Sequence, residues 1–158
     1  TRRYEAWGPT MDRNNLMLNQ VNILFGSVPD DLDDFVFASQ SVQAEAMKYF
    51  VEMWRSRKFE RTGIIWWNVR DGWPIISDAV VDYYGSKKLA YYFLQNVQKN
   101  VCLLINDPVD GAYPLVAVND TRLPAEGIAR AVSDRIEYLE LIPYGCTELR
   151  LTVFPQCN

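Results

Sequence analysis

The side chains with the most to offer chemically lie together between positions 66 and 74. This segment reads WWNVRDGWP and holds three tryptophans within eight residues. Tryptophan supplies a flat apolar surface, while asparagine, aspartate and arginine supply hydrogen bonds. Such a set suits a sugar ring, whose C–H faces stack on an aromatic plane while its hydroxyls meet polar groups. The alternative is that Trp66 and Trp67 are core residues between a sheet and its helices.

A strand is predicted to position this segment. Residues 63–69 read GIIWWNV, a continuous apolar run that is typical of a strand covered on both faces in a parallel sheet. Successive side chains of a strand point to opposite faces, so Trp67 and Asp71 would share one side, and Trp66 and Asn68 the other. We therefore expect Trp67 and Asp71 to line one pocket at the carboxyl end of the strand.

Carboxylates are the second kind of candidate, because glycoside hydrolysis with retention needs an acid and a nucleophile about 5–5.5 Å apart. Glu45 lies in the polar sequence SQSVQAEA, and Asp71, Asp78 and Asp82 follow the predicted strand. No pair among them has a context that marks an acid and a nucleophile, and Glu45 fits the surface of a helix. The sequence therefore predicts no catalytic residue in this chain.

Composition narrows the classes of function. The chain has 158 residues, of which 49% are hydrophobic and 23% charged, values typical of a folded protein. It contains no histidine, which excludes a Ser-His-Asp triad and a histidine-ligated metal site within it. A net charge of −4 argues against a nucleic-acid partner, and no apolar run of about 18 residues suggests a membrane span. We expect no metal and no cofactor.

Cysteine spacing and the N-terminal residues give two further expectations. Cys102, Cys146 and Cys157 show no CxxC pattern, which argues against a zinc site. Cys102 lies in VCLLI and is predicted to be a buried free thiol, with a Cys102–Cys146 bridge as the alternative. The first ten residues, TRRYEAWGPT, include neither Met nor an apolar stretch, so we expect an internal piece of a longer protein.

Upstream of about residue 100 the apolar spacing predicts helices. They cover residues 12–24, about 35–57, and 86–98, with Gly26 ending the first. The apolar stripe of the second helix comprises Phe35, Ala38, Val42, Ala46, Phe50 and Trp54. The acidic run DDLDD before it favours a helix start over a calcium site, because its spacing is not that of an EF-hand loop.

Downstream of residue 100 short alternating runs predict five strands. They cover residues 101–105, 115–119, 128–132, 136–142 and 148–154. The fold class is therefore α/β followed by all-β. Five strands in residues 100–158 suggest an immunoglobulin-like β-sandwich that is incomplete, because a full one takes about 100 residues and seven strands.

Two stretches carry a resemblance to a known family. The run TGIIWWNVRDGWPIISDAVVDYYGSKKLAYYF resembles the end of the catalytic barrel in glycoside hydrolase family 2, particularly its β-mannosidase-like branch. The family pattern there is G-x-x-Y-W-Q-x-N-D-x-W-P, followed by D-Y-Y-G and K-x-L-x-Y. Upstream, ASQSVQAEAMKYFVEMWR resembles the preceding helix of the family, A-S-Q-x-x-Q-A-E-A.

The resemblance implies roles for particular residues. Trp67 matches the tryptophan on the eighth barrel strand that shapes the subsite of the sugar to be cleaved, and Asp71 and Trp73 match the loop after it. Asn68 stands where the pattern has Gln, and Arg70 where it has Asn, which alters the expected hydroxyl contacts. The implied substrate-binding residues are Trp67, Asn68, Asp71 and Trp73.

The resemblance also implies an incomplete enzyme. The acid/base Glu of the family, in an N-E context, and its nucleophile Glu, in an S-E-x-G-like context, are both missing, and a barrel takes about 250 residues. Residues 1–99 are then the last part of a (β/α)8 barrel, and 100–158 the start of a β-sandwich. The parent would cleave β-linked sugars, of the β-mannoside or β-galactoside kind, and this chain alone would be inactive.

Two alternatives remain at the level of the sequence. The chain is either a non-catalytic carbohydrate-binding or interaction module that uses its Trp-rich surface, or a part that supports the barrel with little substrate contact. The expected partners are a carbohydrate and the remainder of the parent chain. No nucleic acid and no membrane are expected, and the sequence predicts no compartment.

An incomplete barrel predicts self-association. Strand edges and apolar faces that the missing strands cover would be exposed, and such surfaces pair with other copies. Sedimentation velocity should therefore show oligomers of the 158-residue chain, and an anilinonaphthalene dye should bind it. A strictly monomeric mass without dye binding would contradict this expectation.

Overall fold

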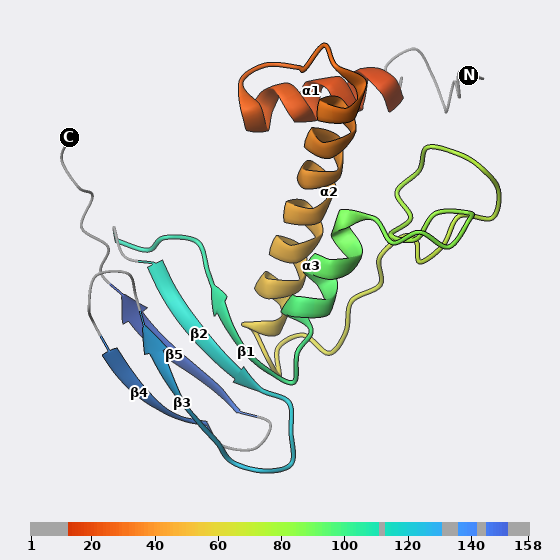
Figure 1. The fold of residues 1–158 in the computed structure, drawn as a ribbon. Helices are drawn as coiled ribbons and strands as arrows, with labels where there is room; N and C mark the ends of the chain where they lie inside the picture. Colours follow the sequence, from red (N-terminus) through yellow and green to blue (C-terminus); the bar gives the residue numbers. More distant parts are fainter. Residues whose placement is uncertain (1–12, 111–112, 131–135, 142–144, 152–158) are drawn as a thin grey trace. The chain divides into compact units, whose positions relative to one another are not determined.

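The computed structural model describes residues 13–110, 113–130, 136–141 and 145–151. Over these ranges three helices precede five strands (Figure 1), and these eight elements follow the predicted order without the strand expected at 63–69. The helices are α1 (Arg13–Phe25), α2 (Leu32–Arg55) and α3 (Leu89–Val97). The strands are β1 (Val101–Ile105), β2 (Tyr113–Asn119), β3 (Ala125–Arg130), β4 (Ile136–Leu141) and β5 (Cys146–Leu151). In the described ranges, none of the helices has the length and apolarity of a membrane span.

Contacts along the chain group it into two compact units. The first consists of Thr1–Met47 and Trp67–Phe93, and the second of Lys48–Trp66 and Leu94–Asn158. The first unit holds the Trp-rich segment from Trp67 onward, and the second holds the described strands. Each is described by itself below.

Local signals set the ends of the first two helices, as predicted. Gly26 has a φ of 78°, and its N–H donates to the Asn22 carbonyl at 2.8 Å, which closes α1. Asp31 caps α2, because its carboxylate accepts hydrogen bonds from the N–H groups of Asp33 and Asp34 at 2.9 and 3.1 Å. The acidic run is therefore a helix start.

The buried face of α2 differs from the predicted stripe. Ala38, Ala44 and Val51 are buried, whereas Ala46 and Phe50 are exposed. Gln40 and Gln43, which are polar and lie outside that stripe, are half-buried and bond to other parts of the first unit. Apolar spacing alone carried no information on these bonds.

The predicted buried strand at 63–69 is wrong. Residues 62–66 form no ladder with any described strand, and only positions 68–71 pair, with residues 80–81. Side chains do alternate, with Ile64, Trp66 and Asn68 half-buried and Ile65 98% exposed. A strand of a parallel sheet receives its cover and its hydrogen bonds from neighbouring strands. The described part of the chain supplies none on either side of residues 62–66.

Antiparallel pairing organises the second unit. One sheet has the order β1-β2-β5, and β3 pairs with β4 in another. The central strand β2 pairs from Val101↔Asn119 to Ile105↔Leu115 on the β1 side. Its residues from Leu115 to Asn119 are all buried, as is Leu104 of β1, so β2 lies at the core of this unit.

Cys102 is a free thiol and is partly rather than fully buried. Burial raises the pKa of this thiol. The bridge to Cys146 does not form. In the sheet both cysteines pair with Val118, one from β1 and one from β5. Two strands on either side of a third lie about 9–10 Å apart, which is beyond the reach of a disulfide.

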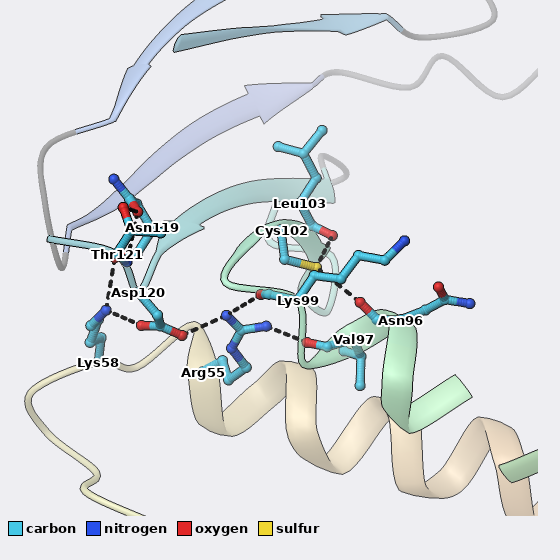
Figure 2. A network of polar contacts seen from close by, with 10 residues as sticks. All are labelled: Arg55, Lys58, Asn96, Val97, Lys99, Cys102, Leu103, Asn119, Asp120 and Thr121. Atoms are coloured by element: carbon cyan, nitrogen blue, oxygen red, sulfur yellow. Dashed lines mark hydrogen bonds and ion pairs between the residues drawn. The ribbon is translucent and has the colours of Figure 1, made fainter. Parts of the chain in front are cut away.

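A polar network joins the end of α2 to the strands (Figure 2). Asp120, directly after β2, accepts hydrogen bonds from Arg55 at 2.6 Å and from Lys58. Arg55 also donates to the carbonyls of Val97 and, at 2.9 Å, Lys99. Three segments of the second unit thus meet at one guanidinium, whose planar fork suits several acceptors at once.

A turn presents Asp120 to this network. The buried Asn119 side chain donates to the Leu123 carbonyl at 2.8 Å and accepts from the N–H of Thr121 at 2.9 Å. Such asparagine turns fix the backbone at the end of a strand. The carboxylate of the next residue is thereby held toward α2 (Figure 2).

The network predicts a dependence of stability on pH. Partial burial acts to raise the pKa of Asp120, but hydrogen bonds and charges from Lys58 and Arg55 outweigh it and hold the pKa below its ordinary value. A lowered pKa stabilises the fold above about pH 4 and loses this effect as the pH falls through the folded pKa. We expect Asp120→Asn to lower the free energy of unfolding at pH 7 by about 1 kcal/mol, and to flatten its decline between about pH 5 and pH 2.5. Urea unfolding followed by circular dichroism measures both.

The matched control is Asp110→Asn, which removes the same charge from an exposed turn. It should change neither quantity appreciably. Parallel loss of stability with falling pH in Asp120→Asn and in the unmodified chain would contradict the role given to this carboxylate.

Candidate functional site

The predicted site residues lie on an irregular segment of the first unit. We call residues 64–74 the tryptophan loop; its last part, from Trp67 onward, belongs to this unit. Trp67 is 80% exposed and Trp73 58% exposed, so both rings offer open surface. The strand-like alternation of side chains directs Trp67 outward, and no helix or strand is assigned to the loop.

Asn68 lies half-buried on the other side of the backbone from Trp67. Its carbonyl accepts a hydrogen bond from the N–H of Val80 at 3.3 Å, and the peptide bond between Trp67 and Asn68 is cis. Its side-chain oxygen, Oδ1, is shielded from water and accepts no hydrogen bond from any described residue. A shielded amide oxygen without a donor is costly, so this atom favours a hydrogen-bonding partner from elsewhere.

Asp71 lies in a different environment from Trp67. Its side chain is only 2% exposed, and it accepts hydrogen bonds from the Ser77 hydroxyl and from the Lys88 ammonium at 3.3 Å. Lys88 also donates to the Ser77 carbonyl at 3.0 Å. The structure therefore does not bring Trp67 and Asp71 together on one open face, because the strand alternation ends before Asp71.

Backbone hydrogen bonds tie the tryptophan loop to the segment that follows it. The N–H of Val81 donates to the Val69 carbonyl at 3.0 Å, and the N–H of Asp71 donates to the Val81 carbonyl at 3.1 Å. The N–H of Lys88 donates to the Val80 carbonyl at 2.9 Å. Val80 is buried and Val69 is exposed, so these bonds connect the outer loop to the interior of the unit.

A tight turn between Asp82 and Ser86 returns the chain toward α3. The Asp82 carboxylate accepts from the N–H of Ser86 at 2.7 Å, and Gly85 adopts a φ of 93°. Arg70 donates to the Tyr83 carbonyl at 2.9 Å, which links this turn to the tryptophan loop.

Two glutamines of α2 complete the support, and the sequence indicated them only as a polar patch. Gln43 donates to the Asp78 carbonyl at 2.6 Å. Gln40 accepts from the N–H of Leu89 at 2.9 Å and thus caps α3 from a distance of 49 positions in the chain. Nothing in the sequence marked Ser77 and Lys88 as site residues. The one feature that pointed to a supporting contact was the pair of glutamines three positions apart on one face of a helix.

The carboxylates that the sequence singled out take structural positions. Asp71 is engaged through both oxygens, Asp82 caps a turn, and Glu45 lies exposed on α2. Within the described ranges, no group of three or more histidine, cysteine, aspartate or glutamate residues is arranged to hold a metal ion. The arrangement is therefore suited to binding through aromatic and amide groups.

Comparisons along the sequence find fungal relatives. The chain is 29% identical over 146 residues to beta-mannosidase B of Aspergillus niger. This match covers 75% of the present chain and 17% of the relative. It is 37% identical over 70 residues to beta-mannosidase B of Aspergillus clavatus, over 42% of this chain and 8% of the relative. No protein-family model matches the chain.

Solved structures share the fold. The beta-D-mannosidase of Dictyoglomus thermophilum superposes with a TM-score of 0.79 at 23% identity, over 90% of this chain and 19% of its own. The exo-chitosanase of Amycolatopsis orientalis superposes with a TM-score of 0.72 at 20% identity, over 92% of this chain and 18% of its own. The chain thus spans less than a fifth of the length of these relatives. The resemblance to the β-mannosidase-like branch of glycoside hydrolase family 2, inferred from the Trp-rich run and the helix before it, is confirmed by relatives in sequence and by neighbours in fold.

Proposed function

We propose that this chain is part of a retaining glycoside hydrolase that acts on β-linked sugars. In this proposal residues 1–99 form the last part of a (β/α)8 barrel, and residues 100–158 begin an immunoglobulin-like β-sandwich. The names of the relatives and the similarity of fold support it. The observation that carries it is the tryptophan loop, which presents Trp67 and Trp73 outward from a supported backbone.

The loop has the chemistry of a sugar subsite. The exposed Trp67 ring offers a plane for the C–H face of a pyranose, and Trp73 offers a second. The unpartnered Oδ1 of Asn68 is an acceptor that a hydroxyl or an N–H of the complete protein can satisfy. Asp71 stands between the two tryptophans in the sequence, but its carboxylate is held by Ser77 and Lys88. Specificity among β-mannosides, β-galactosides and β-glucosaminides would then depend on Asn68 and Arg70, where this chain departs from the family pattern.

Catalysis itself is assigned to the remainder of the parent protein. Retention requires an acid/base and a nucleophilic carboxylate about 5–5.5 Å apart. The family contexts for both glutamates are missing from the sequence, and Asp71 is occupied by Ser77 and Lys88. This chain would therefore hold the sugar while carboxylates outside it break the glycosidic bond.

The exposed apolar side chains of the tryptophan loop fit this proposal. Ile65, Trp67 and Val69 all lie open along one side of an extended backbone. Exposed apolar side chains of this kind mark a surface that another part of a protein covers. In the parent, adjacent strands would cover part of this surface, whereas the isolated chain would pair with other copies.

A non-catalytic carbohydrate-binding module is the alternative, and one observation favours it. Trp67 and Trp73 are already exposed in this chain alone, so a sugar would not need the rest of a barrel to reach them. The two functions differ in what the surrounding protein must supply, and the following two experiments separate them.

The first experiment measures hydrolysis. The 158-residue chain should release no p-nitrophenol from p-nitrophenyl β-D-mannoside, β-D-galactoside or β-D-glucosaminide, because it lacks the carboxylate pair. The product of the complete reading frame that contains it should hydrolyse at least one of them. Turnover by the 158-residue chain would refute the assignment of catalysis to residues outside it. A complete product inactive on all three substrates would favour the binding module.

The second experiment tests the stacking surface. In the complete protein, Trp67→Ala should lower kcat/KM on the preferred substrate by about 10-fold to 100-fold, since stacking on one aromatic ring contributes about 1–3 kcal/mol. The matched control is Tyr113→Ala, which removes an exposed aromatic ring from β2. Unchanged kcat/KM in Trp67→Ala, with Tyr113→Ala also unchanged, would show that this portion only supports the barrel.

A further inference from the structure

We infer that Asp71, Ser77 and Lys88 form a buried clamp that positions the tryptophan loop, and that Asp71 acts behind the loop and does not contact the sugar. This inference rests on the proposed function for its consequence, although the clamp itself is a property of the first unit. It changes the role that the family pattern gives to Asp71, and it adds Lys88 and Ser77 as positioning residues.

The three side chains form a closed set of contacts. Asp71 accepts from the Ser77 hydroxyl and from the Lys88 ammonium, and the same ammonium donates to the Ser77 carbonyl. The Ser77 oxygen in turn accepts from the N–H of Ala79 at 3.1 Å. With a side chain only 2% exposed and both oxygens engaged, the carboxylate has no free face for a hydroxyl of a ligand.

Because the Asp71 carboxylate is buried, its contacts with Ser77 and Lys88 are required for its stability. A carboxylate away from water is stable only when it is paired and hydrogen-bonded, because removing one partner leaves an uncompensated charge. Loss of Lys88 therefore leaves the Asp71 carboxylate with only the Ser77 hydroxyl among its described partners. The loss of this ammonium weakens the packing around residue 71, whose N–H donates to the Val81 carbonyl.

The position of Asp71 in the chain links the clamp to the two tryptophans. Asp71 stands four residues after Trp67 and two before Trp73. The bond from Val81 to the Val69 carbonyl and the bond from Asp71 to the Val81 carbonyl hold the intervening backbone. Lys88 directly precedes α3, whose first N–H is held by Gln40 of α2. The clamp thus connects the loop to two helices of the unit.

The test is amide hydrogen exchange of the complete protein, followed by mass spectrometry of its peptides. In Lys88→Met the peptides that contain Asp71 and Val81 should exchange at least tenfold faster, and a peptide that contains Trp73 should also lose protection. Amides of the β1–β2 pair should keep their rates, and Lys88→Arg should restore most of the protection because it keeps the charge. Asp71→Asn, which keeps the shape of the side chain, should resemble Lys88→Met and provides a second variant if that one folds poorly.

Lys87→Met is the matched control, because this neighbouring lysine lies exposed over the Tyr91 ring at 4.5 Å. It should leave the exchange rates of the peptides that contain Asp71, Val81 and Trp73 unchanged. Unaltered protection in Lys88→Met and Asp71→Asn would overturn the clamp. Equally faster exchange in the β1–β2 pair would also overturn it, by showing a general loss of stability.

A kinetic arm separates the clamp from the proposed function. In the complete enzyme, Lys88→Met should lower kcat/KM by at least tenfold, and Lys88→Arg should recover most of it. Faster local exchange with unchanged kcat/KM would confirm the clamp and refute the sugar subsite that it is proposed to position.

Discussion

The Asp71 carboxylate is held away from water between Ser77 and Lys88. The arrangement of the first unit follows from the requirement that this buried carboxylate be paired and hydrogen-bonded. A buried charge that lost its partner would cost more than the loop gains from its few backbone bonds. The chain around it must therefore follow a path that brings residue 88 to residue 71. That path places Val81 beside Val69 and leaves Trp67 and Trp73 open.

Helix α2 supports the same path from the side. Gln40 and Gln43 bond to a backbone N–H and a backbone carbonyl of the segment that carries the clamp. Buried backbone groups outside regular structure need such partners. A helix face with two glutamines thus stabilises an irregular loop that no described strand covers, and polar contacts behind the exposed rings hold them in position.

Local signals made most elements predictable from the sequence. The start of α2 at an acidic cap, the end of α1 at Gly26 and the antiparallel pairs β1–β2 and β3–β4 depend on neighbours in the chain. The strand predicted at 63–69 depends on partners far away or outside the described residues, so its apolar pattern alone misled. Tryptophan types and spacing indicated the candidate site, but Lys88 is 17 positions from Asp71, and only folding brings them together.

The central claim is that this chain supplies a sugar subsite to a retaining enzyme whose nucleophile lies elsewhere. A retaining glycosidase forms a covalent glycosyl intermediate on a carboxylate, and a 2-deoxy-2-fluoro glycosyl fluoride of β configuration traps it. Peptide mass spectrometry of the trapped complete protein locates the labelled residue. We predict a labelled glutamate outside the 158 residues of this chain, and a label on any carboxylate within them would contradict the account.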